Sequence, residues 1–284
     1  MNEGQLSKFY RIVVKSSQRV PIFSTTLLKL AKSYVDTANG FVGQMKENGE
    51  FALAQRLLEY HNSEHFGSNF TFIDVGANVG EWTEFLVQKS KELNLREVTF
   101  GHLFELSPST FETLKKKFAQ YENLQINQLG LSNKDQDIEY TDFGSGSGVN
   151  TLHIGKQFHS MPSKRSFSKV IKGDSYLHSN PIERIDLLKI DVEGFEYQVL
   201  EGFTPQLESG MIKVIQFEYG YMTAAAGHLL SDFYTFLEVK GYIIGQLTST
   251  GVKFEEFSWV KNDFKSGPNF VACKIDMRNA LSKF

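Results

Sequence analysis

From residue 70 onward, apolar segments of strand length alternate with segments whose apolar residues recur at helical spacing. Helices are expected at 81–93, from 108 to about 118, at 194–201 and in a segment ending at Gly241. Strands are expected at 70–75, 98–104, 124–128, 185–191, 213–219, 242–247 and 269–274, with short strands within 137–173 around a loop at 144–148. Repeated strand–helix units fold as a mostly parallel sheet with helices on both faces. The last two strands are joined by a long connection without a helical pattern, so we expect an antiparallel hairpin at the sheet edge.

The first 66 residues follow a different pattern. Apolar residues recur at helical spacing in 25–38 and 50–60. We therefore predict a helical N-terminal extension, residues 1–66, that packs on a main domain of residues 67–284. The turn-rich stretch "HNSEHFGSN" makes a plausible junction. It places His61 and His65 four residues apart with Glu64, a pattern compatible with a metal, but its composition favours a solvated loop.

Charge and cysteine content narrow the class of protein. The chain has 284 residues, a net charge of −3 and a pI of about 6.2, so it has no global attraction to nucleic acid or to an anionic membrane. The N-terminus lacks the apolar stretch of a signal peptide, and no apolar run approaches the ~20 residues of a spanning helix. The single cysteine, Cys273, lies in an apolar strand and is predicted to be buried and inert. These features predict a soluble, cytoplasmic protein.

Charged residues collect where the buried strand at 185–191 ends, in the stretch "IDLLKIDVEGFEYQVLEG". Lys189, Asp191, Glu193 and Glu196 fall within eight positions. Charges at the carboxyl end of such a strand lie on the rim of the sheet, where open α/β folds bind ligands. Lys189 shares a face with Asp191 and could pair with an acid inside the domain, and Glu196 could cap the next helix. The stretch predicts a ligand site.

The loop "DVGANVGEWT" follows the first strand and opens a helix, which is the context of a nucleotide-type loop. Gly76 and Gly80 permit a tight turn and a close approach of the backbone to a ligand. A dinucleotide would bring its pyrophosphate to the helix N-terminus, where the carboxylates of Asp74 and Glu81 would repel it. Those carboxylates favour a ligand that carries an ammonium and a sulfonium, as S-adenosylmethionine does. The loop therefore predicts a methyl donor.

Two further segments are placed to contact such a donor. Glu105 ends the second strand, where an acid can accept hydrogen bonds from both ribose hydroxyls. After the third strand, "LGLSN" is placed to face the adenine, with Leu131 as an apolar contact and Ser132 or Asn133 as polar ones. An ordinary turn is equally consistent with this last segment.

These stretches, together with "LFELSPSTFETL" and "IQFEYG", resemble the FkbM family of S-adenosylmethionine-dependent methyltransferases over roughly residues 70–245. The resemblance implies a class I methyltransferase (Rossmann-like) sheet, so the expected fold is α/β with the edge hairpin and the helical extension. Gly130 stands where the family pattern has alanine. Methylation of a hydroxyl oxygen is implied, because members act on sugars, polyketide hydroxyls and related metabolites. The implied cofactor contacts are Asp74, Gly76, Asn78, Gly80 and Glu105.

In the implied fold, Asp191 ends the central strand next to the donor sulfur, as a further cofactor contact. Glu193 begins the loop that faces the acceptor, and Glu218 ends the adjacent strand on the same rim. An alcohol is a poor nucleophile at neutral pH, so a base should take its proton. Asp191, Glu193 and Glu218 are the candidates, and His153 and His159 are alternatives beside the glycine–serine loop. The carboxylates could instead hold a divalent ion, but no spacing supports one and no metal is predicted.

The predicted activity is methyl transfer from S-adenosylmethionine to a hydroxyl of a sugar, a glycolipid or a polyketide-type metabolite. The expected partner is a small-molecule or glycan acceptor, with residues 1–66 covering the acceptor side. Two other classes stay open. One is a non-catalytic scaffold with the same fold. The other is a nicotinamide-dependent oxidoreductase, against which Asp74 and the missing third glycine argue.

Overall fold

The structure is a computed structural model that describes residues 8, 11–16, 21–38, 44–64, 67–144, 163–259 and 269–284. The chain divides into two compact units, Met1–Val42 and Gly43–Phe284, which we call the N-terminal unit and the main unit. The N-terminal unit contains helix α2 (Pro21–Ala38). This division lies well before residue 66, where the sequence suggested the boundary.

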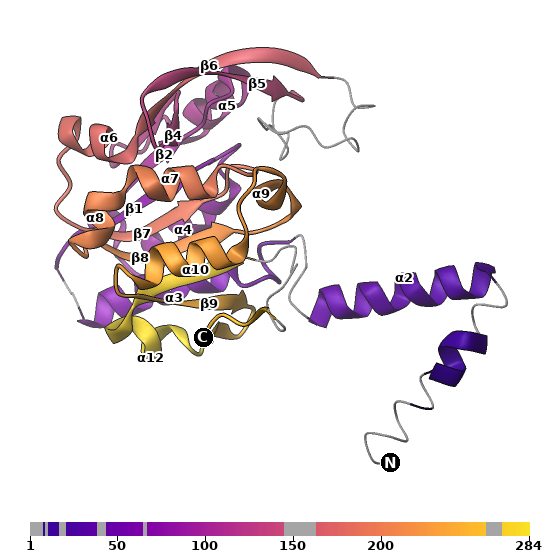
Figure 1. The fold of residues 1–284 in the computed structure, drawn as a ribbon. Helices are drawn as coiled ribbons and strands as arrows, with labels where there is room; N and C mark the ends of the chain where they lie inside the picture. The colour runs from indigo at the N-terminus through magenta and orange to yellow at the C-terminus, as the bar shows by residue number, and fades with distance from the viewer. Residues whose placement is uncertain are drawn as a thin grey trace. The chain divides into compact units, whose positions relative to one another are not determined.

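The main unit is built on an eight-stranded sheet with the order β10-β9-β11-β8-β7-β1-β2-β3 (Figure 1). The pairs β1–β2, β2–β3, β1–β7 and β7–β8 are parallel, which confirms the predicted sheet. The strands are β1 (Phe70–Val75), β2 (Thr99–Phe104), β3 (Leu124–Asn127), β7 (Ile185–Ile190), β8 (Ile212–Glu218), β9 (Tyr242–Thr248), β10 (Gly251–Phe254) and β11 (Asn269–Lys274).

The antiparallel end of the sheet differs in detail from the prediction. β11 does pair antiparallel with β9, but it lies inside the sheet and pairs antiparallel with β8 as well. The edge is formed by β10, a short strand that the sequence reading did not identify, in an antiparallel hairpin with β9. β11 is apolar enough for an internal position: Phe270, Val271 and Ala272 are all buried.

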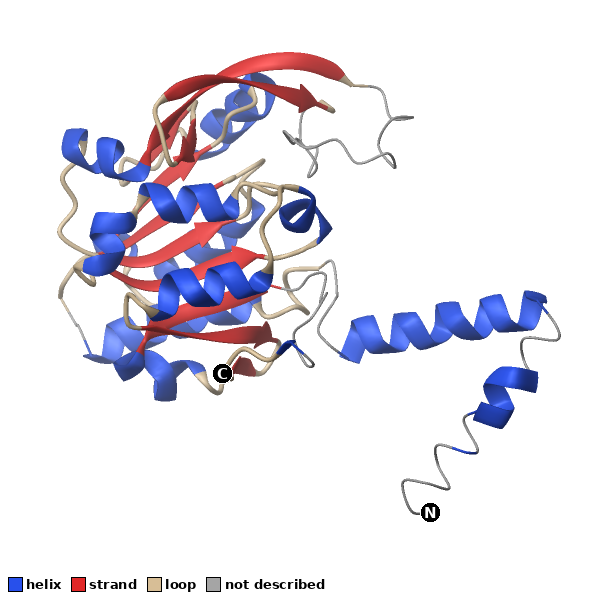
Figure 2. Cartoon of the chain, viewed as in Figure 1, coloured by secondary structure: helices blue, strands red, loops and turns tan. Residues whose placement is uncertain are grey.

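Helices cover both faces of the sheet (Figure 2). The two buried apolar clusters of the main unit contain different helices, which separates the faces. One face carries α3 (Glu50–Glu64), α4 (Glu81–Glu92), α5 (Pro108–Phe118) and α12 (Arg278–Leu281). The other carries α6 (Gly173–Ser179), α7 (Glu196–Gly202), α8 (Thr204–Glu208) and α10 (Leu230–Glu238), and α9 (Tyr221–Ala225) follows β8.

Helix α3 is a core element of the main unit rather than part of an extension. Leu53, Leu57 and Leu58 are buried against the sheet. The helix continues to Glu64, so His61 does not lie in the solvated loop that the sequence favoured. Its ring is buried, with Nε2 3.0 Å from the carbonyl oxygen of Ser68. His65 lies outside the described residues.

A second, three-stranded sheet stands next to the first. It has the order β4-β6-β5, with β4 (Gly130–Ser132) parallel to β6 (Lys164–Lys172) and β5 (Gln136–Asp142) antiparallel to it. The predicted loop at 144–148 lies outside the described residues except for Gly144. The segment 129–133, for which the sequence left an adenine-facing segment and an ordinary turn equally open, contains the strand β4.

Two general predictions can be compared with the structure. Cys273 on β11 is fully buried, as predicted, and burial raises the pKa of its thiol to about 12. Within the described residues, none of the helices combines the length and apolar character needed to cross a membrane.

Candidate functional site

A cavity of about 350 Å³ opens at the carboxyl ends of β1, β2 and β7. β1 pairs with β2 on one side and with β7 on the other, so the chain order reverses at this point of the sheet. Open α/β sheets bind ligands at such a switch point, outside the carboxyl ends of the strands. The cavity thus lies where the sequence placed its ligand site.

The loop between β1 and α4 forms one wall of the cavity. Gly76, Asn78 and Gly80 all have left-handed backbone, with φ of 85°, 50° and 77°. A side chain at Gly76 would overlap the carbonyl oxygen of Asp191, so only glycine lets this loop pass the end of β7. A side chain at Gly80 would overlap Phe118 on α5. The two glycines therefore set the position of the loop.

Glu105, at the end of β2, is fixed by two backbone amides. Its Oε2 accepts from the N–H of Asn78 at 3.1 Å, and its Oε1 accepts from the N–H of Ser107 at 2.7 Å. Burial raises the pKa of this carboxyl to about 7. A carboxylate oxygen has further lone pairs, so Glu105 can still accept hydrogen bonds from a ligand in the cavity.

Asp74 does not line the cavity. It is fully buried, its Oδ2 accepts from the hydroxyl of Thr83 at 2.7 Å, and its Oδ1 lies 3.7 Å from Nζ of Lys189. Lys189 also donates to Asp191 at 3.1 Å, and these two acids hold its pKa above the usual value despite burial. Lys189 thus pairs with acids inside the domain, and a direct contact of Asp74 with the donor stays a prediction.

Three carboxylates converge beside the cavity, and two of them, Asp191 and Glu193, line it. Asp191, Glu193 and Glu218 each offer an oxygen, and the three oxygens lie within 4.8 Å of one another. Burial, followed by the charges of Asp191 and Glu196, raises the pKa of Glu193 to about 8, and the same kind of environment raises that of Glu218 well above its usual value. The structure therefore brings together the three predicted catalytic residues. Their spacing is also compatible with one divalent cation.

One other buried acid, Glu196, supports this rim without facing the cavity. Glu196 accepts from the N–H groups of Val192 and Gly194 and from the hydroxyl of Thr223, which fixes the loop that carries Glu193. Glu193 itself has left-handed backbone with φ of 52°. Such backbone is costly for a residue with a side chain and is often found at functional sites.

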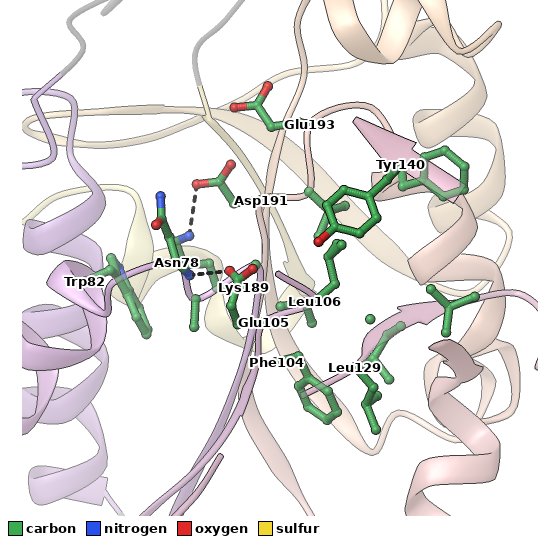
Figure 3. Close-up of a pocket in the computed structure, with 18 of the residues that line it drawn as sticks. Asn78, Trp82, Phe104, Glu105, Leu106, Leu129, Tyr140, Lys189, Asp191 and Glu193 are labelled. Carbon is green, nitrogen blue, oxygen red and sulfur yellow. Dashed lines mark hydrogen bonds and ion pairs between the residues drawn. The ribbon is translucent and has the colours of Figure 1, made fainter. Parts of the chain in front are cut away.

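The opposite side of the cavity is apolar. In Figure 3, Leu129 and Tyr140 lie on the far side from Asn78 and Trp82. Leu131 is a lining residue, as predicted for an adenine contact, whereas Ser132 is buried and does not line the cavity. Several apolar lining residues were not predicted from the sequence. For two of them, Ile138 and Tyr140, the alternation of apolar residues in "DIEYT" is a signal that could have identified them. The missed apolar residues include Met45, Trp82, Leu106, Leu129, Ile138, Tyr140, Val170 and Phe195.

The lining residues fit a nucleoside that carries positive charge. Four lining acids, Glu81, Glu105, Asp191 and Glu193, face one lining cation, Lys189, which is already paired. Among the described residues, the side-chain oxygen of Asn78 is buried without a hydrogen-bond donor. An ammonium group would supply one, whereas a pyrophosphate would meet four carboxylates. The apolar side offers an adenine a dry surface.

The histidines proposed as alternative bases, His153 and His159, lie outside the described residues. The role predicted for residues 1–66 as a cover of the acceptor side stays a prediction. One residue of that range, Met45 in the main unit, lines the cavity.

The strand order, with one antiparallel strand inserted between β8 and β9, and a cavity at the switch point define a class I methyltransferase fold. The sequence profile of the methyltransferase FkbM domain matches residues 74–244, more than half of the chain, and the chain belongs to this family. Its cofactor is S-adenosylmethionine, and its activity is methyl transfer.

Curated relatives agree with this assignment. "Methyltransferase 1" of Beauveria bassiana is 23% identical over 221 residues, which cover 70% of this chain and 80% of that protein. "Hexuronic acid methyltransferase AglP" of Haloferax volcanii is 28% identical over 160 residues, 56% of this chain and 60% of that protein. The chain therefore spans only about three fifths of the second relative.

Solved structures also match this chain, at TM-scores below 0.5. The plantazolicin methyltransferase BpumL in complex with SAH has a TM-score of 0.41 at 13% identity, covering 95% of this chain and 98% of that one. Magnesium protoporphyrin IX methyltransferase from Synechocystis PCC 6803 with bound SAM has a TM-score of 0.39 at 10% identity, covering 80% of each chain.

Proposed function

We propose that this chain transfers a methyl group from S-adenosylmethionine to a hydroxyl oxygen of a sugar, glycolipid or polyketide-type metabolite. The observation that carries the proposal is the convergence of Asp191, Glu193 and Glu218 beside the cavity, which the first two residues line. An alcohol acceptor needs a base, and the cluster offers three. That one relative is named a hexuronic acid methyltransferase supports a carbohydrate acceptor.

We assign the role of base to Glu193. One oxygen of Asp191 already accepts a hydrogen bond from the ammonium of Lys189 at 3.1 Å, so it is less free to receive a proton from the acceptor. Glu218 does not line the cavity, so it is the second choice. Glu193 lines the cavity, and its pKa of about 8 lies near neutral pH, where a general base is most effective.

When bound, S-adenosylmethionine supplies an electrophilic methyl group on a sulfonium and leaves as a neutral thioether, so no acid is needed. Glu105 would accept hydrogen bonds from the ribose hydroxyls, and Leu131 and Tyr140 would contact the adenine. Asn78 would orient the amino-acid end, and the loop set by Gly76 and Gly80 would bring its backbone close to the donor. Glu81, at the first position of α4, would add negative charge beside the same end. The chain's main contribution is to hold the acceptor oxygen, the methyl group and the sulfur in line.

The test is an incubation of the protein with labelled donor and a panel of uronic acids, neutral sugars, glycolipids and polyketides, with products identified by mass spectrometry. A methyl ether on one acceptor class supports the proposal. Methyl transfer to nitrogen, sulfur or carbon acceptors alone would reject the oxygen assignment. Parallel titrations with S-adenosylmethionine and NAD should give heat only with the former, which separates this function from an oxidoreductase.

A further inference from the structure

The charge of the chain is divided unevenly between its two units. The first 42 residues hold six lysines and arginines against two acidic residues, a net charge of +4, whereas the whole chain carries −3 and the remainder therefore −7. The negative net charge of the whole chain therefore does not exclude an attraction of its N-terminal unit to anionic surfaces. The N-terminal unit alone is basic.

Helix α2 in this unit separates apolar from charged residues. At 100° per residue, its five large apolar residues with described side chains fall within an arc of about 160°. Lys29 and Lys32 fall outside this arc. The exposed fractions in the apolar arc are 37% for Leu27, 70% for Leu28, 63% for Leu30, 76% for Tyr34 and 51% for Val35. Soluble proteins rarely expose large apolar residues in one continuous stripe.

We propose that α2 lies flat on the surface of an anionic lipid bilayer, with its apolar arc in the acyl boundary and its lysines at the headgroups. A helix with leucines and an aromatic ring on one face and lysines on the other is typical of such interfacial binding. The helix carries three charges in 18 residues, so it lies on the membrane rather than across it. The net charge of the N-terminal unit is complementary to anionic headgroups.

Two other occupants of the apolar arc fit less well. A second copy of α2 would form a coiled coil through a narrow seam at positions a and d, and the observed arc is wider than such a seam. The main unit would need a continuous apolar patch. Its exposed large apolar residues in the described ranges are instead dispersed over β6, α9, both ends of α10, the segment after β10, and η3 (Ile275–Met277).

Membrane docking would bring the enzyme to acceptors that are carried on a lipid. This consequence, unlike the docking itself, rests on the proposed function, and it favours the glycolipid among the acceptor classes named above. Vesicle binding is measured without methyl transfer, so a failure of the docking proposal leaves the proposed function standing, and the reverse also holds.

The test is flotation of the full chain with vesicles of equal parts phosphatidylcholine and phosphatidylglycerol, and with pure phosphatidylcholine. We expect binding to the mixed vesicles, little to the neutral ones, and release at high salt. Lys29→Gln/Lys32→Gln should weaken binding about 30-fold, because each lysine near an anionic surface contributes roughly fivefold and the two contributions multiply. Leu28→Ser/Leu30→Ser should also weaken it.

The matched controls are Lys115→Gln/Lys116→Gln on the exposed side of α5 and Val239→Ser, which is 78% exposed. These should leave vesicle binding unchanged. Equal binding to neutral and mixed vesicles, or no effect of the α2 changes, would overturn the proposal. A third outcome would also overturn it. If light scattering showed that the parent chain is a dimer and that Leu28→Ser/Leu30→Ser is not, and if the parent chain did not bind vesicles, the apolar arc would belong to a second copy.

Discussion

The ammonium nitrogen of Lys189 lies 3.1 Å from a carboxylate oxygen of Asp191, the residue that follows β7. The same nitrogen is 3.7 Å from Asp74 on β1. Lys189 is only 3% exposed, so one buried cation joins the donor loop to the acid cluster. The pairing explains how a strand as apolar as β7 can end in a concentration of negative charge.

Replacing Lys189 by Met should reduce the free energy of unfolding by about 3–5 kcal/mol, because a buried charge left without its partner is strongly destabilising. Urea unfolding measures this loss. The control is Lys89→Met, which removes the exposed pair of Lys89 with Glu92 and should cost less than about 1 kcal/mol. Equal, small losses in the two variants would show that Lys189 does not hold the site together.

Replacing Glu105 by Ala should weaken binding of S-adenosylmethionine by ~1.5–3 kcal/mol, the range for a hydrogen bond to a charged group. The measurement is isothermal titration at constant pH, with circular dichroism to verify the fold. Glu97→Ala, at an exposed position in the short helix η1 (Arg96–Val98), serves as the matched control. Unchanged affinity in Glu105→Ala would remove the ribose assignment.

Gly76 and Gly67 offer a matched pair of glycines, with φ of 85° and 84°. Alanine at Gly67 meets no atom within 4 Å, so it should cost only the ~1–2 kcal/mol of left-handed backbone. Alanine at Gly76 must also displace the carbonyl of Asp191. We therefore expect Gly76→Ala to lose more stability than Gly67→Ala. We expect donor binding to be lost in Gly76→Ala and kept in Gly67→Ala. If both variants behaved alike, close packing of the loop against β7 would not be the reason for glycine.

The sequence predicted the parts of the fold that depend on local pattern. The apolar runs gave β1, β2, β7 and β8 to within a residue or two, because a strand buried on both faces has a continuous apolar sequence. The placement of β11 between β8 and β9 could not be read in this way. An internal and an edge strand can share one composition, and strand order is decided by long-range pairing.

The site shows the same division. Glu105 and Asp191 were found because each directly follows a strand whose end lies on the rim. Tyr140 reaches the cavity only because the second sheet stands beside the first, and Glu50 reaches Gln216 on β8 only because α3 packs in the core. Contacts of this kind depend on packing between segments far apart in the chain, for which one sequence has no local signal.

Stability of the ligand-free protein should fall as pH rises from about 5 to about 8.5. Folding raises the pKa of Glu193 to about 8 and those of Glu105 and Glu196 to about 7. Between the unfolded value and these values the folded chain binds more protons, so the free energy of unfolding decreases with pH. Glu193→Gln removes one of these groups and should therefore be stabilised relative to the parent at alkaline pH, with little difference below about pH 4.5. The measurement is the melting temperature of both proteins as a function of pH. An identical pH dependence in the two proteins would contradict the crowding of the three carboxylates.

The most direct test of the assigned chemistry is the single-turnover rate of methyl transfer by Glu193→Gln, measured on the acceptor found in the panel, alongside its affinity for S-adenosylmethionine. The replacement keeps the shape of the side chain and removes its basicity. The account predicts a rate lower by about 10²–10⁴-fold, the usual contribution of a general base, with donor affinity changed by no more than a few-fold. A parental rate in Glu193→Gln would contradict it, and the same measurement on Glu218→Gln would then show whether the base lies on β8.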